Sequence, residues 1–79
     1  MILTDGIHLV SDIPGEEGEQ ELHAFARKLQ FRRAWFQRHP VHPHYDLTTA
    51  RAVRRAREAG AQATSSREIA KMFLRRKKT

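Results

Sequence analysis

The chain has 79 residues, enough for one domain, and its 15 Lys and Arg against 9 Asp and Glu give a formal net charge of +6. With 39% hydrophobic and 30% charged residues, the composition is that of a basic, folded module. It excludes a transmembrane helix, which needs about 20 consecutive apolar residues, and the absence of cysteine excludes a disulfide scaffold and an iron–sulfur site.

The size of the chain sets further expectations. We expect residues 1–79 to form a single small domain with a basic tail at 75–79, and, because no secretory signal is recognisable, a cytoplasmic protein. A chain this short buries only about 60–65% of the surface that its unfolded form exposes, which leaves a thin margin of stability. We therefore expect a homo-oligomer, with any ligand site in a surface groove or between subunits.

The first two apolar runs, Met1–Thr4 and Ile7–Val10, are typical of β-strands. Asp5-Gly6 between them fits a two-residue hairpin turn, and one long strand with a bulge at Gly6 is the alternative, between which the sequence does not decide. Residues 11–15 form a loop, since Pro14 and Gly15 resist regular structure.

A helix is predicted to begin in the glutamate-rich segment 16–21, because carboxylates are favoured at the positive end of the helix dipole. Its apolar side chains recur at helical spacing, which predicts a core-facing stripe at Leu22, Phe25, Ala26 and Leu29. His23, Arg27 and Gln30 fall on a neighbouring stripe.

The second half of the chain reads as strand, loop, helix, strand and helix. The aromatic segment Arg33–Gln37 predicts a strand, and Arg38–Asp46 predicts a loop with three His and two Pro. Thr48 or Thr49 can cap a helix that runs to Ala59 and ends at Gly60. Residues 61–64 predict a weak strand, and Ser65 with Glu68 forms a capping box for a last helix.

This order of elements predicts an α/β fold: a small, mainly parallel sheet of three to four strands with about three helices. Ligands of parallel sheets usually bind at the carboxyl ends of the strands. We therefore expect a site where residues 11–12, 37–46 and 64–67 meet.

Several segments together resemble the small bacterial and phage family DUF4031, a domain of unknown function. The segments are Ile7–Asp12, Glu21–Ala26, Trp35–Gln37, His44–Leu47, Gly60-Ala61 and Ser66–Glu68. The resemblance covers nearly the whole chain, and His44-Tyr45-Asp46 is among its most specific parts. Asp5-Gly6 stands where many members have a longer stretch that contains Trp. The resemblance implies a fold and a map of motifs, and no activity.

The candidate ligand-binding residues combine imidazole, phenol, indole and guanidinium groups. Aromatic rings can stack on a base, and Arg together with the start of the last helix can bind phosphate. The predicted set is His23, Arg27, Trp35, Gln37, His44, Tyr45, Asp46, Ser66 and Arg67.

A metal site and a catalytic site are alternatives with thinner support. His39, His42 and His44 have a spacing that can bind zinc, and Asp5, Asp12 and Asp46 could converge as in a metal-dependent nuclease. The chain has no Gly-rich phosphate loop and no nucleophile elbow. We therefore expect no metal and no cofactor, and we leave enzymatic activity open while favouring a protein that is not an enzyme.

The sequence thus favours non-enzymatic binding of a phosphorylated small molecule of nucleotide type, for example by a phage protein that sequesters a nucleotide signal of host defence. One alternative is a nucleic-acid-binding module that uses Arg51, Arg54, Arg55, Arg75, Arg76 and Lys77. A second alternative is a protein inhibitor or interaction module that uses exposed aromatic residues as anchors. We expect no membrane partner.

Overall fold

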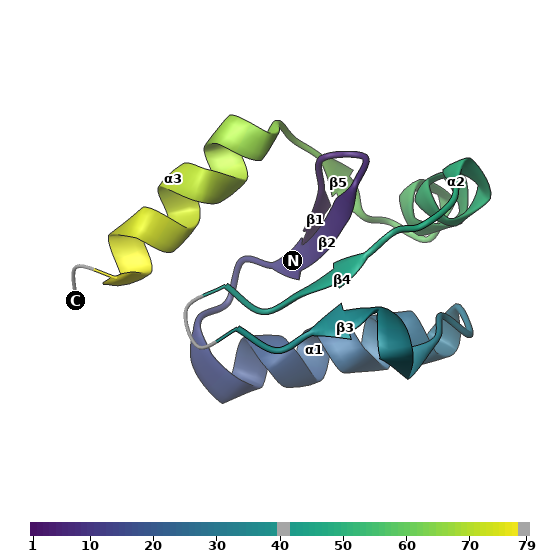
Figure 1. Ribbon diagram of the computed structural model, residues 1–79, viewed down its shortest axis with the longest axis horizontal. Helices are drawn as coiled ribbons and strands as arrows, with labels where there is room; N and C mark the ends of the chain where they lie inside the picture. The colour runs from purple at the N-terminus through teal and green to yellow at the C-terminus, as the bar shows by residue number, and fades with distance from the viewer. Residues whose placement is uncertain (40–41, 78–79) are drawn as a thin grey trace.

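The computed structural model describes residues 1–39 and 42–77, which form a sheet flanked by helices on both faces (Figure 1). The strands are β1 (Ile2–Thr4), β2 (His8–Ser11), β3 (Phe36–Gln37), β4 (His44–Asp46) and β5 (Gln62–Ala63). The helices are α1 (Gly15–Lys28), α2 (Ala50–Glu58) and α3 (Ser66–Lys77), with one 3₁₀ turn at Arg33–Trp35. None of the helices in these described ranges has the length and apolar character needed to cross a bilayer.

The sheet is mixed and mostly antiparallel, so the predicted mainly parallel sheet is wrong. The strand order is β3-β4-β2-β1-β5, and only β1 and β5 pair in parallel. Two short connections explain the difference, because β1 joins β2 and β3 joins β4 without a helix between them. The helical crossovers through α1 and α2 still link strands that run in the same direction.

Two predicted elements differ in detail from the structure. Arg33–Gln37 was expected to be one strand, but its first three residues form the 3₁₀ turn and only Phe36–Gln37 pairs with β4. Arg38–Asp46 was expected to be a loop, but its last three residues are β4, which lies between β2 and β3. The β-branched residues that usually mark a strand are missing from His44-Tyr45-Asp46.

The structure adopts the hairpin alternative for Asp5-Gly6, but the turn is longer than the predicted two residues, since residues 5–8 separate the last pair, Thr4 and Leu9. β1 and β2 pair in antiparallel register from Ile2 opposite Ser11 to Thr4 opposite Leu9. The Asp5 carboxylate accepts hydrogen bonds from the backbone N–H groups of Ile7 and His8, at 2.9 and 2.7 Å. This side-chain bridge closes the turn.

The alternation of side chains along the strands divides the core into two parts. On one face Leu9 and Tyr45 pack with Ile2 against α1 and α2, through Leu22, Ala26, Ala52 and Ala56. On the other face Leu3 and Val10 pack against α3, through Ile69, Met72 and Phe73. α1 and α3 accordingly lie on opposite sides of the sheet (Figure 1).

The predicted cap of α2 is confirmed, and so is the bond to the Ser65 hydroxyl in the predicted capping box of α3. The Thr49 hydroxyl accepts the N–H of Ala52 at 3.0 Å, and the Ser65 hydroxyl accepts the N–H of Glu68 at 3.1 Å. Gly60 follows α2 with φ +111°, in the left-handed region that favours glycine.

Gly18 has a role that the sequence pattern does not reveal. It lies inside α1, where a Cβ would overlap the backbone carbonyl of Ile13. The absence of a side chain therefore lets α1 fold back closely onto the loop that follows β2.

Candidate functional site

A groove of about 550 Å³ lies between α3 and the neighbouring strands β2 and β4. We call it the α3 groove. Its apolar wall includes Val10, Ile69 and Phe73, which belong to the core under α3. Polar side chains complete the lining: Asp5, His8, His39, His42, His44 and Ser66. The groove thus combines an apolar surface with a polar rim, as small-molecule sites commonly do.

Strand register places the polar side chains on one face of the sheet. His8 and Val10 alternate with Leu9, so both project toward α3. Asp46 lies opposite His8 in the β2–β4 pair, and Gln37 lies opposite His44 in the β3–β4 pair. A polar row therefore crosses this face from β3 through β4 to His8 at the start of β2.

Asp5 links the hairpin to the first turn of α3. Its side chain is only 1% exposed and accepts hydrogen bonds from His8 Nδ1 at 2.9 Å and from the Ser66 hydroxyl at 2.8 Å. Burial opposes ionisation of this carboxyl, but the bonds from His8, Ser66 and the Ile7 backbone outweigh it and lower the pKa of Asp5 to about 2. Asp5 is therefore an anion at neutral pH.

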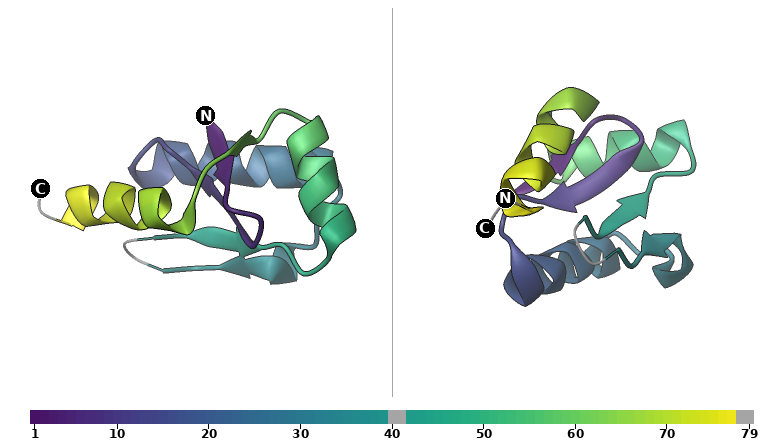
Figure 2. Two further views of the ribbon diagram at one scale, coloured as in Figure 1. Left: turned by 90° about the horizontal axis from the view of Figure 1, so that it is seen from above. Right: turned by 60° about the vertical axis from the view of Figure 1, so that its left-hand side comes forward.

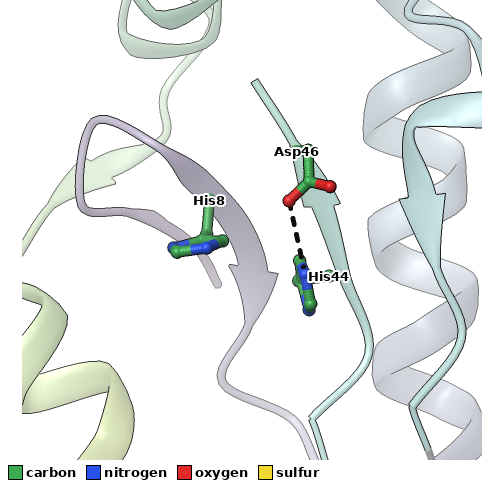
Figure 3. A group of neighbouring side chains, drawn as sticks. All are labelled: His8, His44 and Asp46. Carbon is green, nitrogen blue, oxygen red and sulfur yellow. Dashed lines mark ion pairs between the residues drawn. The ribbon is translucent and has the colours of Figure 1, made fainter. Parts of the chain in front are cut away.

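His8, His44 and Asp46 come together at the open side of this face (Figure 3). His44 Nε2 lies 3.3 Å from Asp46 Oδ1, and the rings of His8 and His44 meet edge to face with centroids 5.1 Å apart. His44 Nδ1 is 2.9 Å from the carbonyl oxygen of His42. Because a carbonyl only accepts, Nδ1 carries the proton in this bond.

Several predicted ligand residues lie on the opposite face of the sheet. Tyr45 is only 2% exposed, and its hydroxyl forms a 2.6 Å hydrogen bond with His23 Nδ1. Burial lowers the pKa of His23, against the opposing effect of Glu19, and burial raises the pKa of Tyr45. Trp35 packs at the edge of the same core, with its ring 5.5 Å from that of Phe31.

The structure thus divides the predicted ligand-binding set between the two faces. Gln37, His44, Asp46 and Ser66 share the α3 side, and Arg67 follows Ser66 at the exposed start of α3. His23, Trp35 and Tyr45 lie on the α1 side, where Arg27 is an exposed residue of α1. Since the sheet separates the two groups, they do not surround one ligand.

Asp5, His8 and the apolar wall of the groove are absent from the ligand-binding set that the sequence predicts. A signal for them was present. His44 and Asp46 are two residues apart, which puts both side chains on one face of a strand, but only if that segment is recognised as a strand. A loop at residues 44–46 has no partner strand, so the prediction of a loop leaves out the residues of β2.

The two alternative metal groups are placed differently. His39 and His42 stack with ring centroids 3.4 Å apart, and His44 Nδ1 is directed to the His42 carbonyl. Of the three aspartates, Asp5 and Asp46 flank His8, whereas Asp12 follows the far end of β2 and pairs with the N-terminal amine at 2.7 Å. The three carboxylates therefore do not converge.

The basic residues proposed for nucleic acid lie at two ends of the molecule, on α2 and at the end of α3 (Figure 2). Arg55 lies over the Phe31 ring at 5.7 Å, and Arg76 donates to the Ser11 carbonyl at 2.9 Å. Both arginines therefore have structural roles. Arg51, Arg54 and Arg75 are exposed, and residues 78 and 79 of the predicted basic tail lie outside the described residues.

A second depression, of about 1300 Å³, is larger than the α3 groove. It is lined by carboxylates and arginines together, among them Asp12, Glu16, Glu19, Arg38 and Arg75. This mixture favours neither an anionic nor a cationic ligand, so the α3 groove is the better candidate site.

Comparison with known proteins places the chain in a family. The family described as protein of unknown function (DUF4031) matches residues 5–76, and the chain belongs to it. The match includes Asp5, His8, His44 and Asp46. No curated protein and no solved structure matches the chain.

Proposed function

We propose that this member of the DUF4031 family is a non-enzymatic protein that binds a phosphorylated small molecule of nucleotide type in the α3 groove. The observation that carries the proposal is the combination of an apolar wall with histidine and hydroxyl groups in one space of about 550 Å³. A volume of this size is within the range of small-ligand pockets. Sequestration of a nucleotide signal is one biological use of such a protein.

The two kinds of lining match the two parts of a nucleotide. A base is a flat apolar ring with polar edges. The side chains of Phe73, Ile69 and Val10 form an apolar surface on which such a ring can pack. Phosphate oxygens accept hydrogen bonds, and the backbone N–H groups at the Ser66 end of α3 offer donors on the same side. The net charge of +6 favours an anionic ligand over a cationic one.

Thermal unfolding of the full chain with a panel of nucleotides, cyclic nucleotides and ADP-ribose tests the proposal. At a ligand concentration about a hundred times Kd, binding raises the melting temperature of so small a domain by roughly 10 to 20 °C. Ala70 lines the groove from an exposed position of α3, so Ala70→Phe fills the space. Ala24→Phe makes the same change at an exposed position of α1 and is the control.

The expected result is a shift for the wild type and for Ala24→Phe, and no shift for Ala70→Phe. The proposal fails if no member of the panel raises the melting temperature. It also fails if Ala70→Phe responds as the wild type does.

A further inference from the structure

We propose that His8, His44 and Asp46 form a binding site for a divalent first-row transition-metal ion such as Zn²⁺. Among the residues that the structure describes, these three side chains form the group of His, Asp and Glu whose ligand atoms are close enough to share an ion, all within 4.8 Å of one another. Two imidazoles and one carboxylate are a common ligand set for such ions. The inference does not depend on the proposed nucleotide, because it concerns the binding of the ion itself.

Both histidines are held so that their Nε2 atoms are available. His44 Nδ1 donates to the His42 carbonyl, and His8 Nδ1 donates to the buried Asp5 carboxylate. With Nδ1 protonated, neutral imidazole has its lone pair on Nε2, which is the form that binds a metal. Oxygen acceptors behind metal-binding histidines are the usual arrangement, since they fix the tautomer and the ring orientation.

The spacing between His44 and Asp46 fits a metal ion between them. The Nε2 and Oδ1 atoms are 3.3 Å apart. Bonds of about 2.0 to 2.1 Å at a tetrahedral ion place two ligand atoms about 3.3 Å apart. When His44 is neutral, its Nε2 and the Asp46 Oδ1 both carry lone pairs, and these repel each other. A cation between the two atoms removes this repulsion.

His8 completes the site from the neighbouring strand. It lies opposite Asp46 in the β2–β4 register, and its ring stands perpendicular to that of His44 (Figure 3). The ligand atoms lie within 4.8 Å of one another. The distance between any two of them therefore has to shorten by at most about 1.5 Å to match the separation of ligand atoms at a tetrahedral ion. The His8 side chain is 39% exposed and has room for this movement.

The site is open on one side. Asp46 is 41% exposed, and His8 and His44 line the α3 groove. An ion bound by three protein ligands keeps at least one free coordination position, as catalytic and ligand-binding metal sites do. If a phosphorylated ligand also occupies the groove, that position can take a phosphate oxygen and offset the negative charge of Asp5 and Asp46.

The competing interpretation is a simple ion pair between a protonated His44 and Asp46. In that case the two residues need no metal, and divalent ions bind no better than they do to any exposed histidine. The stacked pair of His39 and His42 is a second possible source of weak metal binding. The experiment separates these cases by substitution.

Isothermal titration of the metal-free full chain with zinc chloride at neutral pH is the test, with no nucleotide present. The site predicts one ion per chain and a loss of more than about tenfold in affinity for His44→Gln and for Asp46→Asn. The control variant His23→Gln, on the other face of the sheet, is expected to bind as the wild type does, and His42→Gln tests the histidine loop as a separate source of binding. Circular dichroism of each variant without metal checks that it is folded.

Asp5→Asn tests the positioning role of Asp5. It puts an amide donor behind His8 Nδ1 and favours the tautomer with the proton on Nε2. We expect unchanged stoichiometry and an affinity that is lower by about 10 to 100-fold. Cobalt absorption spectra of wild type and Asp46→Asn give a second readout, because the loss of a carboxylate ligand changes the spectrum of the bound ion.

The proposal is overturned if the wild type takes up no zinc at micromolar concentration, or if Asp46→Asn binds as tightly as the wild type. Loss of binding in His42→Gln with retention in Asp46→Asn would move the site to the histidine loop. Repeating the thermal unfolding with nucleotides in the presence of a chelator distinguishes the two proposals. Nucleotide binding is then measured without metal and zinc binding without nucleotide, so either proposal can fail while the other holds.

Discussion

His23 lies in an environment that differs from the one predicted for it. The sequence placed it in a ligand site with Arg27, but its side chain is 14% exposed and its hydrogen bonds go to Tyr45 and Glu19. The periodicity of α1 correctly put it beside the core stripe. The pairing with Tyr45 could not be predicted, because it needs the fold of β4 onto the same face.

The burial of His23 predicts a pH dependence of stability. Burial and the charges of Arg33 and Arg38 lower its pKa in the folded state, while Glu19 acts in the opposite direction. A folded pKa below the unfolded value means that the unfolded chain binds the proton more readily. The free energy of unfolding should therefore fall as the pH drops below about 6.5.

Urea denaturation between neutral and mildly acidic pH measures this effect in the wild type and in His23→Gln. The variant retains a group that can bond to Tyr45 but cannot take up a proton. We expect the variant to lose part of the decrease in stability that the wild type shows on acidification. Parallel pH curves for the two proteins would contradict the assignment and move the titration to the other histidines.

At the scale of elements, the sequence predicted the helices well and the strands less well. The helix bounds follow from local chemistry, namely glutamates at the start of α1, Thr49 and Gly60 around α2, and Ser65 before α3. β4 has no comparable local signal, since its pairing depends on β2 and β3 from distant parts of the chain. That missing strand, together with the β1–β2 hairpin, explains the wrong sheet type, and it also explains the division of the predicted site.

The cap of α2 gives a prediction with a matched control. Thr48 and Thr49 are adjacent and both could cap the helix by sequence, but only the Thr49 hydroxyl accepts the Ala52 N–H. Loss of such a cap costs about 1 kcal/mol. Thr49→Ala should therefore reduce the free energy of unfolding by about this amount, whereas Thr48→Ala should change it by less than about half as much.

Urea denaturation curves of the two variants and the wild type provide the measurement. Because the variants differ only in which of two neighbouring exposed threonines is removed, the change in composition is the same. Equal losses for the two variants would show that the hydroxyl bond at Thr49 contributes nothing specific to α2.

At the scale of the whole molecule, the expected homo-oligomer stays a prediction. Met1, Ile7 and Leu74 are exposed large hydrophobic residues, with 54%, 58% and 56% of their surface accessible. Leu74 also lines the α3 groove, so a partner chain that covered it would narrow the groove. The interaction-module hypothesis would use the same exposed side chains, and it likewise stays a prediction.

The net charge of +6 belongs to the molecule as a whole and attracts the phosphates of nucleic acid. Arg51 and Arg54 are exposed on α2, and the basic end of α3 lies at the opposite end of the molecule (Figure 2). A straight duplex contacts one of these ends more easily than both. We therefore expect about three phosphate contacts rather than six, and weak binding that depends moderately on salt.

Fluorescence anisotropy with labelled duplex DNA and single-stranded RNA at rising salt measures the number of contacts. Three contacts predict a loss of about 40-fold in affinity between 50 and 200 mM salt, whereas six contacts would give a loss of about 2000-fold. The double change Arg51→Ala and Arg54→Ala should weaken binding at low salt more than Lys28→Ala with Arg32→Ala, which removes the same charge from exposed positions in and after α1. A salt dependence that corresponds to six contacts, with tight binding, would mean that both basic ends act together, and it would favour the nucleic-acid-binding module over the nucleotide binder.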